Sequence, residues 1–433
     1  MAFFIEGIVQ MLGIIENETS SLTAECIRRR AQINADPSFL SERRLKALEH
    51  YLATPMPGRR DEAWRRVEFG DLNIEAASVR APFVELASLS SQSNEARSKG
   101  VFWGTPEQAA KDHAEVLQRY WNTEVFPAGA TGTTPHDRKF HSLNQALWES
   151  GYVYHVPKSV GVELPVKAEF RTRDGRDGIF PHNLIVLEEG SSATVIESYV
   201  SLRPDEQSGL CCPQTEIILG RGARLRYILL QTTGPQIVYI GAHRTHQFAE
   251  SKLTFVSAHL GSRLEKAFLE TRMLEPKGHA YLSGLYYGTG DQKIHMDTLQ
   301  HHVAPECTTD LMFKGALDNK ARGVYRGMIH LEREAQKTDA YQQNRTLLLS
   351  DDARVDAIPG LEILANDVRC THGATAGQID PTILFYLMSR GITEFQAKKM
   401  IMDGFFEEVM LRFGLEAVIE PLRKQIDGKI GNH

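Results

Sequence analysis

The chain has 433 residues, of which 42 % are hydrophobic and 24 % are charged, with 49 basic against 55 acidic side chains. This length allows two or three units with a sizeable core, and the net charge of −6 argues against a general nucleic-acid binder. The five cysteines are few and widely spaced. That usage favours free thiols in a reducing compartment over a secreted disulfide framework.

The first twenty residues, MAFFIEGIVQMLGIIENETS, are apolar enough to imitate a targeting signal. However, they lack a basic segment, carry Glu6 inside the apolar run, and are too short to span a membrane. No later stretch of the sequence is long and apolar enough either. We therefore expect an amphipathic helix that packs on protein here, and a soluble cytoplasmic protein with no membrane or nucleic-acid partner.

Residues 1–150 are predicted to form a helical and mixed region. Apolar residues recur at three- and four-residue steps around 22–33 and 39–52, which is the helical period. Loop-rich sequence follows, and then the helix-like stretch FHSLNQALWESG, where Gly151 is placed to end the helix.

Residues 151–379 contain short runs of Val, Ile, Leu, Tyr and Thr between polar turns, such as NLIVLEEG and ARLRYILLQTT, which indicate strands. Similar turn-and-strand segments begin near residues 190, 220, 249, 318 and 350. A strand repeat of roughly 30 residues predicts a β-solenoid, or β-helix, whose rungs stack on one core. A β-sandwich with regular turns is the alternative. A solenoid also has open ends, which must be capped or paired with another chain.

Residues 380–433 are predicted to form a C-terminal helical domain. Asp380 followed by Pro381 is a typical helix start, and Thr393 with Gln396 forms a capping box for a second helix. The second helix has a broad apolar face that includes Phe395, Met400, Phe405 and Phe406. Such a face either packs on its own domain or forms a docking surface for a partner.

The segment NDVRCTHGATAGQIDP places Cys370 and His372 two positions apart, with Gly373 next. In a strand, such side chains emerge on the same face, with Cα atoms about 6.5–7 Å apart. The thiolate and a ring nitrogen can then approach one metal, or one another. His301 and His302 are adjacent and should point to opposite faces, whereas His279, His295 and His330 are read as hydrogen-bonded histidines of the strand region.

The stretch KTDAYQQNRTLLLSDDARVDAIPGLEILANDVRCTHGATAGQIDPTILFYLMSRGI resembles the C-terminal half of the SufB/SufD iron–sulfur cluster assembly proteins. The stretches GRRDEAWRRVEFGDL and LNQALWESGYVYHVPKSVGVELPV extend this resemblance over nearly the whole chain. The CTHGAT form resembles the SufD branch. The SufB branch would have a glutamate in place of Gly373 and a cysteine near residue 350, where this chain reads Leu349-Ser350-Asp351-Asp352.

The resemblance implies a mostly β protein: a right-handed parallel β-helix flanked by N- and C-terminal helical regions. It also implies a scaffold rather than an enzyme, which pairs with a SufB-like homologue and docks a SufC-like ATPase through its C-terminal domain; homodimerisation is left open. A transient iron–sulfur cluster would form at the subunit interface, with His372 and Cys370 as candidate ligands. Because a cluster usually takes four ligands, the others would come from the partner. No G-x-x-x-x-G-K-[ST] motif occurs, so the nucleotide must be bound by another chain.

Two enzyme classes are the alternatives. A thiol enzyme would use Cys370 as a nucleophile activated by His372, but the two side chains emerge in parallel and no carboxylate is evidently placed to orient the imidazole. A carbohydrate-active β-helix enzyme would need Asp or Arg residues clustered on one face, and no convincing set is evident.

Overall fold

The structure is a computed structural model that describes residues 22–69, 78–79, 83–88, 93–127, 137–172, 177–201 and 209–430. The helix expected within the first twenty residues lies outside this part of the chain. None of the described helices is long and apolar enough to cross a membrane.

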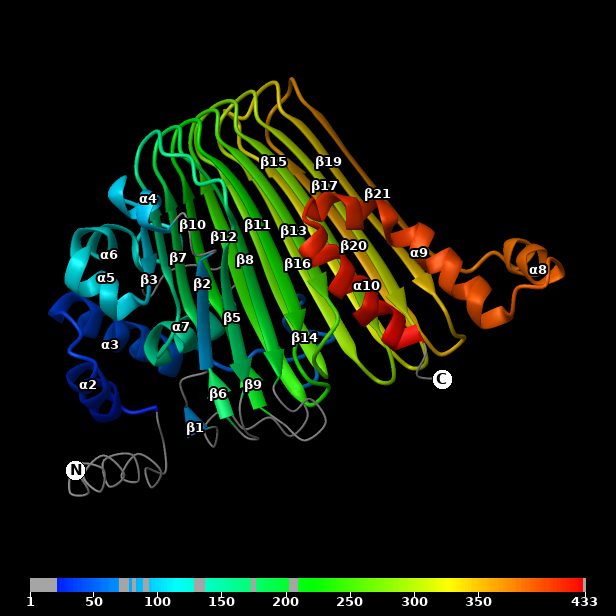
Figure 1. Cartoon of the computed structure of the whole chain (residues 1–433), viewed down its shortest axis with the longest axis horizontal. Helices are drawn as coiled ribbons and strands as arrows, with labels where there is room; N and C mark the ends of the chain where they lie inside the picture. Colours follow the sequence, from blue (N-terminus) through cyan, green and yellow to red (C-terminus); the bar gives the residue numbers. More distant parts are fainter. Residues whose placement is uncertain are drawn as a thin grey trace.

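Two β-sheets face each other and form a β-solenoid (Figure 1). Along most of the chain, successive strands alternate between the sheets, so that β16 pairs with β14 and β18, and β17 pairs with β15 and β19. Equivalent positions lie one rung apart, as in the parallel register Ser192–Arg224–Lys252–His279. The predicted solenoid with a rung of roughly 30 residues is therefore confirmed, and the sandwich alternative is wrong.

The first sheet, called sheet A, has parallel strands except where β3 pairs with β4. Its strands are β1 (Ser78–Val79), β3 (Phe102–Gly104), β4 (Val153–Val156), β6 (Asp177–Ile179), β7 (His182–Leu187), β9 (Gly209–Cys211), β10 (Gln214–Leu219), β12 (Ile237–Gln247), β14 (Leu264–Met273), β16 (Lys293–His302), β18 (Arg322–Leu331) and β20 (Arg354–Ile363).

The second sheet, called sheet B, is parallel except where β2 pairs with β5. Its strands are β2 (Phe83–Ser88), β5 (Val166–Thr172), β8 (Ser192–Ser201), β11 (Arg224–Thr232), β13 (Lys252–His259), β15 (His279–Gly288), β17 (Thr308–Leu317), β19 (Asp339–Leu348) and β21 (Arg369–Gln378). The turn-and-strand segments near 190, 220 and 249 lead into sheet B, whereas those near 318 and 350 lead into sheet A. The two sets of segments lead into different sheets because both turns of a rung have the same sequence pattern, a polar turn followed by alternating apolar residues.

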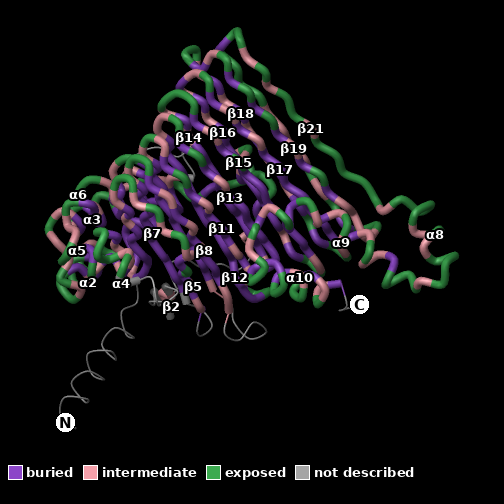
Figure 2. The backbone as a smooth tube through the Cα atoms, turned by 45° about the horizontal axis from the view of Figure 1, so that its top comes forward, coloured by how far each residue is buried: buried purple, intermediate pink, exposed green. Residues whose placement is uncertain are grey.

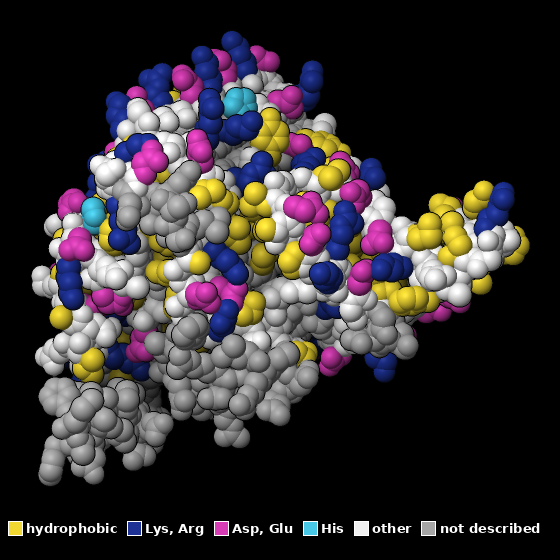
Figure 3. All heavy atoms as spheres, in the orientation of Figure 1, with side chains coloured by type: hydrophobic (Ala, Val, Ile, Leu, Met, Phe, Trp, Pro, Cys, Tyr) yellow, Lys and Arg dark blue, Asp and Glu magenta, His cyan; other side chains and the backbone are white. Residues whose placement is uncertain are grey.

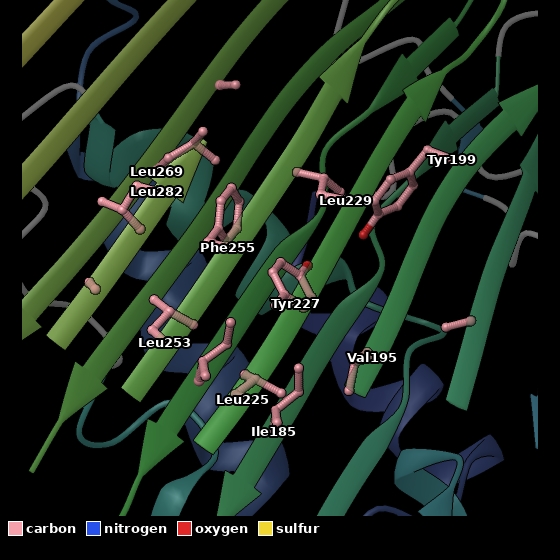
Figure 4. Packing of buried hydrophobic residues seen from close by; sticks show 14 of the residues in the cluster. Ile185, Val195, Tyr199, Leu225, Tyr227, Leu229, Leu253, Phe255, Leu269 and Leu282 are labelled. Atoms are coloured by element: carbon pink, nitrogen blue, oxygen red, sulfur yellow. The ribbon is translucent and has the colours of Figure 1, made fainter. Parts of the chain in front are cut away.

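The main core lies between the sheets, where inward side chains of successive rungs stack (Figure 4). Strand alternation explains how this core forms, because every second residue of each strand points inward. Tyr227 and Leu229 of β11 pack in one cluster with Phe255 of β13 and Leu282 of β15.

The N-terminal helices are α2 (Ala24–Ile33), α3 (Ser38–Ala53), α4 (Ser93–Ser98), α5 (Pro106–Asp112), α6 (Ala114–Tyr120) and α7 (Asp137–Leu147). Most of the N-terminal helices pack on the outer face of sheet A, whereas Ala96 of α4 packs against the core between the sheets. Trp64, Phe140 and Trp148 are buried in one cluster with Leu184 and Phe268 of sheet A. The N-terminal region also contributes β1, β2 and β3, which the helical period did not predict.

The C-terminal segment forms α8 (Pro381–Ser389), α9 (Glu394–Phe413) and α10 (Glu416–Ile430). The side chain of Asp380 caps α8, and Thr393 with Gln396 forms the predicted capping box of α9. Helices α9 and α10 lie along the outer face of sheet B, whereas α8 extends beyond the solenoid (Figure 1).

Candidate functional site

The solenoid has an open end at β20 and β21. Within the described residues, β20 pairs only with β18, and β21 pairs only with β19. The outer main-chain N–H and C=O groups of both strands are thus available to another chain. Figure 2 shows the change from the buried middle strands to the largely exposed β21.

Cys370 and His372 lie on β21 and share the inward face. Their register partners on β19 are Ala340 and Gln342, and both partners are buried. His372 is exposed and Cys370 is half-buried, because no further rung covers them. The expectation that the two side chains share one strand face is confirmed, and the fold adds that this face is the end of the solenoid interior.

The thiol of Cys370 packs beside the small apolar cluster of Ile329, Leu331, Ala335 and Ala340. Burial raises the pKa of Cys370, and this effect exceeds the opposite effect of a hydrogen bond from the backbone of Ala340. His372 has no hydrogen bond or ion pair within the described part of the chain. The isolated chain therefore holds a protonated thiol without an activating partner, which does not favour the thiol-enzyme alternative.

Strand β20 supplies an apolar border to the same open end. Leu361 and Ile363 are in register with Ile329 and Leu331, which are fully buried, yet each keeps 38 % of its surface exposed. Sequence reasoning missed these residues. The alternation of RVDAIPGLEI, where every second residue is apolar, could have indicated that these side chains share one face. That no further rung covers this face is seen only in the tertiary structure.

The apolar face predicted on α9 is divided by the structure. Phe406 is 1 % exposed and packs against sheet B, so its assignment to a docking surface is corrected. Phe405 is half-buried in the same cluster, with its ring 5.3 Å from Lys314 Nζ. Phe395 and Met400, by contrast, are 49 % and 52 % exposed. Apolar residues surround much of this helix, and the sequence alone did not decide which of them face the sheet.

Helix α8 is the second feature that sequence reasoning missed. None of its residues is buried, although its sequence PTILFYLMS is almost wholly apolar. Ile383, Phe385, Tyr386 and Met388 are 51 %, 72 %, 56 % and 43 % exposed. Figure 3 shows hydrophobic side chains gathered on this protruding helix. A contiguous exposed apolar surface of this kind is typical of an interaction site.

The segment from residue 170 to residue 405 matches the family model described as SUF system FeS cluster assembly, SufBD core domain. The chain belongs to the SufBD family. The matched segment runs from β5 through the open end of the solenoid and into α9.

Full-length relatives agree with this assignment. Proteins named iron–sulfur cluster assembly SufBD family protein from Staphylococcus saprophyticus, Staphylococcus haemolyticus and Staphylococcus aureus are each 26 % identical to this chain over 447 aligned residues. Each alignment covers 95 % of this chain and 94 % of the relative. A role in SUF-system iron–sulfur cluster assembly follows for this SufBD protein.

Proposed function

We propose that this SufBD protein is a SufD-type scaffold subunit that pairs with a SufB-like homologue and docks a SufC-like ATPase, with the nascent cluster formed at the subunit interface. The observation that carries the proposal is the open end of the solenoid, where Cys370 and His372 lie on the inward face of the last strand. The subunit itself would be no enzyme, and would act in the cytoplasm, where its five free thiols stay reduced.

Pairing is supported by the unsatisfied strand edges together with the apolar border of Leu361 and Ile363. A chain that adds its own strands there would satisfy the main-chain groups and cover both side chains. A homologue with a similar solenoid presents a surface of matching shape and spacing. A second copy of this chain would present one too, so homodimerisation of the isolated subunit belongs to the same proposal.

The number of ligands supports a shared cluster. Cys370 and His372 offer two donor atoms on one face, whereas a cluster usually takes about four. The raised pKa of Cys370 means that its thiol must lose a proton when it binds iron. Cluster binding at this end would therefore need the further ligands that a partner supplies, together with the iron charge that stabilises the thiolate.

Docking of the ATPase is proposed for α8 and the exposed start of α9. Phe385 and Tyr386 of α8 with Phe395 and Met400 of α9 form the most exposed apolar side chains of the C-terminal helices beside Ile383 and Leu411. Burying one such large side chain stabilises an interface by about 1.5–3 kcal/mol. This revises the expected docking set, because Phe406 and most of Phe405 belong to the packing on sheet B.

Co-purification from the native cell tests the assembly: a homologous β-helix chain and a small ATPase are expected to be recovered with this subunit. Anaerobic reconstitution with iron and sulfide tests the site. The isolated chain should bind iron weakly, and a stable cluster should form only when the partners are added. A stable cluster ligated by four residues of the isolated chain would contradict the proposal.

A further inference from the structure

A ladder of metal-binding residue types crosses the outer face of sheet A, on the side of the sheet opposite to Cys370 and His372. His301 of β16, His330 of β18 and Glu362 of β20 are consecutive register partners. The two imidazole rings have centroids 4.7 Å apart, which matches the spacing of neighbouring strands. His302 points inward, with Nε2 3.0 Å from Thr309 Oγ1, so the adjacent histidines face opposite sides as expected.

Glu332 follows β18 directly, and its carboxylate contacts both His301 and His330. Glu332 Oε1 lies 3.0 Å from His301 Nε2 and 3.3 Å from His330 Nε2. One donor atom from each of these three residues lies within 4.8 Å of the others, and no other such group of three occurs among the described residues. Ligands held about 2.0–2.1 Å from one tetrahedral ion are separated by about 3.3–3.5 Å. The two contacts of Glu332, at 3.0 and 3.3 Å, are close to this separation, so small side-chain shifts would bring the three donor atoms around one ion.

Glu362 supports the ladder from the other side. Its Oε2 lies 3.2 Å from His330 Nδ1, where it can accept the Nδ1–H hydrogen. This contact leaves the lone pair on His330 Nε2, an atom that is shielded from solvent and makes no hydrogen bond in the described structure. A carboxylate that orients a histidine through its second nitrogen is the usual outer partner of a metal-bound imidazole.

We propose that His301 Nε2, His330 Nε2 and Glu332 Oε1 form a binding site for a divalent first-row transition metal ion, Zn²⁺ or Fe²⁺, with Glu362 as a positioning residue. Two imidazoles and one carboxylate are a donor set that suits these ions. A cavity of about 330 Å³, lined by both histidines and Glu362, adjoins the site and leaves room for a further ligand from solvent. The proposal is independent of the cluster site, because it uses neither Cys370 nor His372.

The test is a titration of the full-length chain, stripped of metal with a chelator, with Co²⁺ as a spectroscopic probe and Zn²⁺ as a competitor. One equivalent of Co²⁺ should bind with visible absorption bands of low-symmetry coordination, and one equivalent of Zn²⁺ should displace it. His330→Gln and Glu332→Gln, which nearly keep side-chain size, should each weaken binding at least about tenfold. Glu362→Gln should weaken it by about 10–100-fold without changing the thermal unfolding of the metal-free chain, since Glu362 is largely exposed.

The matched control is the double variant Cys370→Ser with His372→Ala, which should keep the full Co²⁺ equivalent and its spectrum. Two results would overturn the proposal. One is wild-type protein that takes up no stoichiometric Co²⁺ or Zn²⁺, which leaves the ladder as a hydrogen-bonded network. The other is binding that persists in His330→Gln and Glu332→Gln but disappears in the control variant, which assigns the metal to the open end of the solenoid.

Discussion

His372 lies directly across the sheet B ladder from Gln342, and the two differ in what covers them. Gln342 is buried at 1 % exposure because β21 lies over it, whereas His372 is exposed because nothing described lies over β21. Gln342 Nε2 also makes no hydrogen bond within the described residues. The last strand of sheet B therefore places the polar side chain of His372, which no further strand covers, at the end of the core and two positions from Cys370.

His372→Ala should abolish or sharply reduce cluster assembly in cells while the subunit stays folded and bound to its partners. The reason is that an exposed imidazole contributes little to stability but can act as a ligand or proton carrier at the interface. Cys370→Ser should have a milder effect, because a sulfur ligand of the partner can replace the thiol. The readout is the activity of an iron–sulfur enzyme that depends on this pathway.

The control for this experiment is Thr371→Ala, which changes an exposed residue on the opposite face of the same strand. It should leave assembly unchanged. Normal enzyme activity with His372→Ala, at normal levels of the subunit, would refute the assignment of this residue.

Leu361→Asp combined with Ile363→Asp should separate this subunit from its solenoid partner. Each side chain faces the open end and is 38 % exposed in the isolated chain, so a partner would bury the remaining apolar surface, and a carboxylate placed there would be buried without an ion-pair partner. The expected loss of affinity is at least about 100-fold, measured by calorimetry or sedimentation. Arg354→Ala, an exposed change on the outward face of β20, should pair normally; unaltered pairing of the double variant would place the interface elsewhere.

Phe385→Asp should weaken ATPase binding by about 10–100-fold, because it removes a large apolar side chain that is 72 % exposed before docking. The melting temperature of the Phe385→Asp variant should match that of the unchanged chain. Phe395→Asp should behave in the same way, since Phe395 is also exposed.

Phe406→Asp is the contrasting variant on the same pair of helices. It places a carboxylate in the packing between α9 and sheet B and should destabilise the chain by several kcal/mol, roughly 3–5. Phe405→Asp should show a smaller drop in melting temperature because Phe405 is only half-buried. If Phe385→Asp lowers the melting temperature as much as Phe406→Asp does, α8 is packing rather than docking surface.

Stability should fall as the pH is lowered from about 7 toward 5. Burial lowers the pKa of His141, His243, His246 and His295 to about 3, whereas an unfolded histidine titrates near 6.5. A depressed pKa in the folded state means that the unfolded chain takes up the extra protons, so stability is present above pH 6.5 and is lost below it. Each group contributes up to about 1.4 kcal/mol per pH unit in this window.

Denaturant unfolding at several pH values measures this slope as the number of protons taken up. His141→Phe supplies a matched variant, because His141 lies between the rings of Phe126 and Phe268 and its Nε2 has no hydrogen-bond partner in the described structure. The variant should reduce proton uptake by about one. A flat stability profile between pH 7 and 5 would show that these histidines are not held neutral.

The sequence by itself determined the features that depend on neighbouring residues. Strand alternation placed Cys370 and His372 on one face and His301 and His302 on opposite faces, because the side-chain period of a strand is 2 wherever the strand lies. Caps behaved likewise: Thr393 and Gln396 form their box within one turn of helix, so the start of α9 could be predicted from four residues.

Only the tertiary structure decided which residues meet across rungs and which are left uncovered. His301, His330 and Glu362 are 29 and then 32 positions apart, so no fixed sequence period brings them together; the length of each turn sets the register. The same holds for Phe405 and Phe406, whose burial depends on the face that α9 turns to sheet B, and for Leu361, which is exposed because the ladder stops at β20. The burial of a side chain depends on residues that are distant in the sequence, and local periodicity does not indicate which of them pack against it.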